Sequence, residues 1–116
     1  MGIAFKEIEI EGKKFRALVN TGFIGEVLIS KKAAENLDLK VIEEKERITA
    51  DNRKIKVKVA VAKVKMDDEE GRMFVEIVED SPVEVLLGVL ALEKLGYIVN
   101  PKTGMIEKIG TFKNFI

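Results

Sequence analysis

Few side chains in this sequence are able to carry out acid–base or nucleophilic chemistry. The 116 residues include no His and no Cys. Their absence excludes histidine-ligated zinc, thiolate metal sites, disulfides and every Ser-His or Cys-His catalytic system. Carboxylates, lysines, hydroxyls, backbone groups and the one tyrosine, Tyr97, remain. Any catalysis must therefore rest on this short list.

One segment places a polar triplet directly after an apolar run: Ala17-Leu18-Val19-Asn20-Thr21-Gly22-Phe23. It resembles the active-site signature of retropepsin-like aspartic peptidases, in which apolar residues precede Asp-Thr-Gly. The Phe that follows is similar to a small prokaryotic branch of that family. Farther along, Ala50-Asp51-Asn52-Arg53 is similar to the tip of the family's flap hairpin, and Leu86-Leu87-Gly88 to its second signature. The segments 25–29, 32–39 and 96–101 are also similar to the family, so the resemblance spans about residues 3–107 in the family's order.

The resemblance implies an all-β fold, a retropepsin-like acid-protease barrel with one or two short helices, in a single domain over residues 1–116. One signature in so short a chain implies a symmetric homodimer with its active site on the two-fold axis. In that mechanism two carboxylates share one proton and activate a water that attacks a peptide bond. No cofactor and no metal is implied. The implied site residues are, for catalysis, Asn20, Thr21 and Gly22; for substrate binding, Phe23, Ala50, Asp51, Asn52 and Arg53; and, in the second signature, Leu86, Leu87 and Gly88.

Position 20 departs from the family pattern, because it holds Asn where the family has Asp. An amide has nearly the shape of a carboxylate, but it has no proton equilibrium near neutral pH and serves neither as base nor as acid. A homodimer carries the substitution twice, so we expect the chain to be inactive as written. Asn20 is either engineered or natural, and a natural Asn20 makes the protein a non-catalytic peptide-binding pseudoenzyme or assembly module. Slow deamidation of Asn20 to Asp is a third possibility.

The hydrophobic pattern repeats mostly every second residue, which predicts β-strands. Two short helices are expected at 31–37, with Ser30 as N-cap, and at 90–95, with Gly96 as C-terminal stop. In the long run 54–66 the apolar residues change parity, which predicts a bulge near 60–63. The other expected strands cover about 3–10, 15–19, 27–29, 74–78, 83–87, 97–99 and 105–106, and Val41-Ile42 and Ile48 suggest further strands.

The charges argue against a nucleic-acid partner, because 20 basic residues balance 20 acidic ones. Lysines along 54–65 predict a solvated outer face, and the acidic run 67–70 a solvated turn. The 34% of charged residues resembles a thermophile's intracellular protein. No apolar stretch approaches the ~20 residues of a membrane span, so we expect a cytoplasmic protein with no membrane partner. Phe112, Phe115 and Ile116 either join the dimer interface or cap their own barrel.

Overall fold

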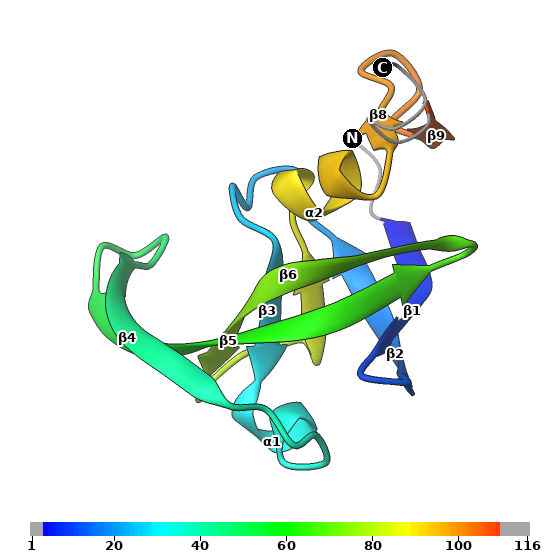
Figure 1. Cartoon of the computed structure of the whole chain (residues 1–116). Helices are drawn as coiled ribbons and strands as arrows, with labels where there is room; N and C mark the ends of the chain where they lie inside the picture. The colour runs from blue at the N-terminus through cyan, green and yellow to red at the C-terminus, as the bar shows by residue number, and fades with distance from the viewer. Residues whose placement is uncertain (1–3, 110–116) are drawn as a thin grey trace.

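The computed structural model describes residues 4–109. Strands dominate, and two short helices interrupt them (Figure 1). The strands are β1 (Ala4–Ile10), β2 (Lys13–Val19), β3 (Val27–Ser30), β4 (Val41–Ile48), β5 (Lys54–Met66), β6 (Glu69–Val78), β7 (Val85–Leu87), β8 (Tyr97–Val99) and β9 (Ile106–Lys108). The helices are α1 (Lys31–Ala34) and α2 (Val89–Lys94).

Six of the strands close into a barrel. They follow one another in the order β1-β2-β7-β3-β6-β5, and the end of β5 pairs with β1 to complete the ring. Strand β4 lies outside the ring as the partner of the first half of β5, and the two form a long hairpin that curves away from the barrel (Figure 1). The all-β retropepsin-like barrel expected from the sequence is confirmed.

The centre of the sheet combines parallel and antiparallel neighbours. Strand β2 runs parallel to β7, with Val19 opposite Leu87, and β3 runs parallel to β6 and antiparallel to β7. Parallel neighbours end at the same edge of a sheet. The loop that follows Val19 and the turn that follows Leu87 therefore leave the barrel side by side, which brings together two segments about 68 residues apart in the chain.

Alternating side chains fill the barrel. Each strand turns every second residue inward, as the period-two pattern predicts. Helix α2 covers one end of this core with Ala91 and Leu92, and Tyr97 packs beside them. Inward residues with almost no exposed surface include Ile8, Ile10, Ala17, Val27, Ile29, Ala62, Val64, Met66, Val75 and Leu87. Burial of this apolar surface is the main stabilising term of the fold.

The expected helix boundaries are close to those observed. Ser30 caps α1 as predicted, because its Oγ accepts the backbone N–H of Ala33 at 3.1 Å. The α-helix itself ends at Ala34, so it is shorter than the expected 31–37. Helix α2 begins at Val89, one residue before the prediction, and Gly96 ends it with a φ of +87°.

The predicted bulge in β5 is wrong. Its register with β6 is continuous from Lys58 opposite Ile77 to Met66 opposite Glu69. The parity of the apolar residues changes because β5 buries a different face in each half. Val57 and Val59 are buried on the outer face, where Val59 lies opposite Glu76. From Ala60 onward, the buried residues lie on the face that points into the barrel. The register irregularity lies in β4, between Val41 and Glu43.

Some sequence expectations concern residues at the edges of the described part. Phe112, Phe115 and Ile116 lie outside it, and so does the start of the first expected strand. The acidic turn consists of Asp67 and Asp68 only, because β6 already begins at Glu69. Within residues 4–109, none of the helices has the length and apolar character needed to cross a membrane.

The burial of Leu87 predicts a large difference between two leucine truncations. Leu87→Ala removes a side chain with no exposed surface, whereas the matched control Leu90→Ala truncates one that is 43% exposed. We expect Leu87→Ala to lower the free energy of unfolding by about 2–5 kcal/mol and Leu90→Ala by less than about 1 kcal/mol. Urea denaturation followed by circular dichroism measures both, and equal losses would contradict the described core.

Candidate active site

The segment Asn20-Thr21-Gly22 forms a tight exposed loop at the end of β2. The Asn20 N–H donates to the Leu87 carbonyl at 3.0 Å, and the Phe23 N–H donates to the Asn20 carbonyl at 3.1 Å. The Asn20 side chain accepts the Gly22 N–H through Oδ1 at 2.9 Å. This segment, with Phe23, is called the signature loop below. Its first three residues are exposed to solvent, and Phe23 is buried and packs the loop against the protein.

The second signature packs directly against the signature loop. The Gly88 N–H donates to the Glu26 carbonyl at 2.8 Å, the Val89 N–H to Phe23 at 3.2 Å, and the Leu90 N–H to Gly25 at 3.1 Å. These are the first N–H groups of α2, which have no partner inside the helix. Carbonyls of the chain between β2 and β3 thus satisfy them, and the two signatures hold each other in place.

Gly88 is required for this contact. A Cβ at position 88 would lie 2.2 Å from the Gly25 carbonyl oxygen and 2.8 Å from that of Phe23. Gly25 is similarly confined, since its Cβ would lie 2.6 Å from the Phe23 ring. Both glycines therefore serve the close approach of two backbone segments to each other and to Phe23.

Residues 50–53 form the tip of the β4–β5 hairpin. The Thr49 N–H donates to the Arg53 carbonyl at 2.8 Å, and Asn52 takes a φ of +63°, as a tight turn requires. The Thr49 hydroxyl donates to Asp51, which lowers the pKa of that exposed carboxyl, and Arg53 pairs with it at 2.8 Å. No hydrogen bond joins Ala50–Arg53 to Asn20, Thr21 or Gly22 within residues 4–109.

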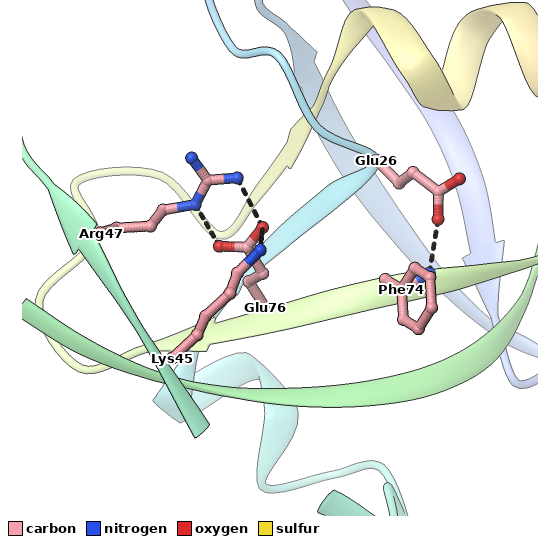
Figure 2. Close-up of polar contacts among 5 residues, drawn as sticks. All are labelled: Glu26, Lys45, Arg47, Phe74 and Glu76. Carbon is pink, nitrogen blue, oxygen red and sulfur yellow. Dashed lines mark hydrogen bonds and ion pairs between the residues drawn. The ribbon is translucent and has the colours of Figure 1, made fainter. Parts of the chain in front are cut away.

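A charged cluster that the sequence did not reveal connects the hairpin to the signature loop. Arg47 of β4 binds Glu76 of β6 through two N–H groups, Nε to Oε1 and Nη2 to Oε2, the second at 2.6 Å (Figure 2). Lys45 adds a second cation 3.3 Å from Oε2. The Arg47 guanidinium also lies 4.9 Å from the centre of the Phe23 ring, within cation–π range.

Glu76 is the one buried charged residue among residues 4–109, with 4% of its surface exposed. Burial by itself raises the pKa of a carboxyl, but the hydrogen bond and charge of Arg47, together with Lys45, outweigh it and hold the pKa of Glu76 below its ordinary value. The signal in the sequence is a lone glutamate in the apolar run Phe74–Val78. Sequence alone did not give its partner, 29 residues earlier in the chain.

Glu26 ties the exit of the signature loop to two other elements. Its carboxylate accepts the backbone N–H of Phe74 in β6 at 2.6 Å (Figure 2) and the Lys94 ammonium of α2 at 3.1 Å. An ionised acceptor makes such hydrogen bonds stronger than neutral ones. The position of Glu26 just before β3 therefore connects the loop, the barrel and the helix.

A hollow of about 530 Å³ adjoins Thr21 and is mostly apolar; Val89, Leu92 and Tyr97 are among its lining residues. The Tyr97 hydroxyl donates to Asp67 at 2.9 Å. Burial and this carboxylate raise the pKa of Tyr97 to about 12, so the phenol stays protonated at physiological pH and is not available as a base. Nor do three carboxylates converge into a metal-binding group anywhere in residues 4–109.

Comparison with known proteins agrees with this geometry. A family model described as "gag-polyprotein putative aspartyl protease" matches residues 6–94, which include the signature loop, the β4–β5 hairpin and the second signature. The match covers more than half of the chain, and the protein therefore belongs to this retropepsin-like aspartyl protease family. No curated protein matches the chain.

The contact at Gly88 predicts a strongly unfavourable alanine substitution. Gly88→Ala places a methyl group on the Gly25 carbonyl, so either the two loops separate or the strand end shifts. We expect a loss of about 2–3 kcal/mol or more in the free energy of unfolding. Gly71→Ala is the control, because its Cβ meets no atom closer than 3.9 Å. Urea midpoints that fall equally in both variants would refute the close approach.

The lowered pKa of Glu76 predicts that part of the free energy of unfolding depends on pH. A carboxyl with a lowered pKa stabilises the folded state above its unfolded value, here 4.5, and this contribution disappears as the pH falls through the folded pKa. We therefore expect Glu76→Gln to be less stable than the unaltered protein at pH 7 and the difference to shrink below about pH 4.5. Denaturation midpoints from pH 7 to 3 test this, with the exposed Glu43→Gln as control; a constant difference would contradict it.

Proposed function

We propose that this chain is a retropepsin-like aspartic peptidase domain over residues 1–116 that works as a homodimer, with Asn20 at the position of the catalytic Asp. Its ligand is a peptide or an unfolded polypeptide. Family membership supports the proposal, and one observation carries it: the Asn20 side chain sits at the exposed tip of a loop held by the second signature. We expect no cofactor and a cytoplasmic location.

An aspartate at position 20 has a defined place in this loop. The Gly22 N–H, which now donates to Asn20 Oδ1, is able to donate to one oxygen of a carboxylate in the same way. The other oxygen is then free for a water or for the equivalent carboxylate of a second chain. Two carboxylates about 3 Å apart do not both ionise, so one acts as base toward the water and the other donates to the substrate carbonyl.

A second copy of the chain is needed because one copy holds one signature. Asn20, Thr21 and Gly22 are exposed in the single chain, and Ile24 beside them is 76% exposed. An isologous contact across this edge pairs position 20 with itself. In this arrangement Thr21 bonds across the dimer, Gly22 permits the close approach of the two loops, and Phe23 and residues 50–53 border the peptide.

With an amide at position 20, neither copy has a base or an acid for the reaction. The chain as written then binds peptides without cleaving them, which is the alternative function: a non-catalytic peptide-binding or assembly module on the same fold. The loop geometry suits both functions, since Oδ1 makes the same hydrogen bond in Asn and in Asp. Activity after restoration of the carboxylate distinguishes them.

Asn20→Asp is expected to create peptide-cleaving activity. General acid–base groups typically contribute about 10²–10⁴-fold each, so cleavage of an unstructured polypeptide should rise by at least that factor over the unaltered protein. The shared proton predicts a bell-shaped rate profile with its maximum on the acidic side of neutrality, and inhibition by pepstatin. Cleavage of a quenched fluorescent casein from pH 3 to 8 measures it.

The control is Asn36→Asp, the same substitution at an exposed position after α1. Light scattering follows the oligomeric state of all three proteins, and intact-mass measurement detects deamidation of Asn20. A folded, dimeric Asn20→Asp protein without activity would favour the binding module over the peptidase. A strictly monomeric protein at high concentration would refute the shared site.

A further inference from the structure

The β4–β5 hairpin is attached to the rest of the molecule by more than its own strand pairing. Arg47, two residues before its turn begins, reaches across to Glu76 in the barrel and lies on the ring of Phe23 in the signature loop. Gly25 lies next to the Arg47 guanidinium, and a Cβ on Gly25 would be only 3.1 Å from Arg47 Nη2. One side chain thus contacts the hairpin, the barrel and the loop that bears Asn20.

The barrel determines where this guanidinium lies. Glu76 pairs with Val59 of β5 and with Leu28 of β3, so its backbone is fixed on both sides. Its carboxylate is buried, and a buried charge requires a cation with good geometry. Arg47 meets that need with two parallel N–H groups, the arrangement in which a guanidinium fits a carboxylate best.

The same guanidinium also lies over the Phe23 ring, with its central carbon 4.9 Å from the ring centre. A guanidinium is able to bind a carboxylate through its edge and an aromatic ring through its face at the same time, and an ammonium is not. Lys45 illustrates the difference: it lies on the same strand and contacts the same Glu76, but its side chain is 44% exposed, and no aromatic ring of residues 4–109 makes a cation–π contact with it. Its pairing with Glu76 is therefore the weaker one.

We propose that Arg47 is a positioning residue. It holds the β4–β5 hairpin at a fixed position relative to the signature loop, by binding Glu76 in the barrel and Phe23 in the loop. The hairpin and the loop then move as one unit when a peptide binds between them. This inference rests on the proposed function, in which residues 50–53 border the substrate. The contacts of Arg47 with Glu76 and Phe23, called the clamp below, are present in the unaltered chain, so their effect is measurable without catalysis.

Hydrogen exchange in the unaltered Asn20 protein provides the first test. Loss of hydrogen bonds to a charged group in Arg47→Met should raise exchange of the hairpin amides, residues 41–53, by about tenfold or more. Lys45→Met, the matched control on the same strand and face, should change it by less than about threefold. Arg47→Lys keeps the charge but loses the two parallel N–H groups, so its exchange should lie between those of the other two variants. It replaces Arg47→Met as the test variant if Arg47→Met does not fold.

Two results overturn the clamp. Equal exchange in Arg47→Met and Lys45→Met would mean that charge alone matters. A uniform rise that includes β7 and α2, residues 85–94, would mean that Arg47 only stabilises the fold as a whole. The expected pattern is a rise confined to the hairpin and the signature loop, with Glu76→Gln giving the same pattern and adding little to Arg47→Met in the double variant.

Steady-state kinetics in the Asn20→Asp background provide the second test. A positioning role predicts that Arg47→Met lowers kcat/KM by about tenfold or more, that Arg47→Lys restores part of it, and that Lys45→Met has little effect. An unchanged kcat/KM in Arg47→Met would overturn the link to substrate. If Asn20→Asp itself is inactive, the proposed function fails, and the exchange experiment still decides whether the clamp exists.

Discussion

The close approach of two loops at Gly88 is the constraint on which the rest of the structure depends. Parallel pairing of β2 with β7 ends both strands at one edge, and the N–H groups of Gly88, Val89 and Leu90 then bind carbonyls of the chain between β2 and β3. A single Cβ at position 88 would occupy the space of the Gly25 carbonyl. The signature loop is held by this backbone contact together with the hydrogen bond from the Gly22 N–H to Asn20 Oδ1, an oxygen acceptor that an amide and a carboxylate both have.

Electrostatic interactions in this chain fall into two kinds. Most ion pairs lie at the surface, such as Arg53 with Asp51 at the hairpin tip, and pairs of that kind contribute little to stability. Glu76 differs because its carboxylate is buried and its two cations come from another strand. A buried carboxylate without a cation is costly, and this cost is the physical basis of the proposed positioning of the hairpin by Arg47. In the proposed arrangement this ion pair therefore contributes to the position of the hairpin as well as to the pH-dependent stability of the fold.

Family membership and the proposed catalytic chemistry depend on different parts of this protein. The match over residues 6–94 includes the barrel, the two signatures and the hairpin, all of which are present with Asn at position 20. The chemistry proposed for the family site depends on one proton shared between two carboxylates, and an amide has no such proton to share. The chain lacks His and Cys, and burial together with Asp67 raises the pKa of Tyr97 to about 12, so this phenol stays protonated at physiological pH.

The sequence by itself determined the features that depend on near neighbours. Alternating side chains predicted the strands, Ser30 and Gly96 marked helix ends, and the resemblance of the two signatures to those of a known family indicated the family. It misjudged β5, where the parity change reflects burial on both faces, and it missed Arg47 and Glu76. Only the tertiary structure decided these, because strand pairing brings together residues far apart in the chain. Local pattern carries no information on which face a distant strand will cover or which buried carboxylate a given arginine will meet.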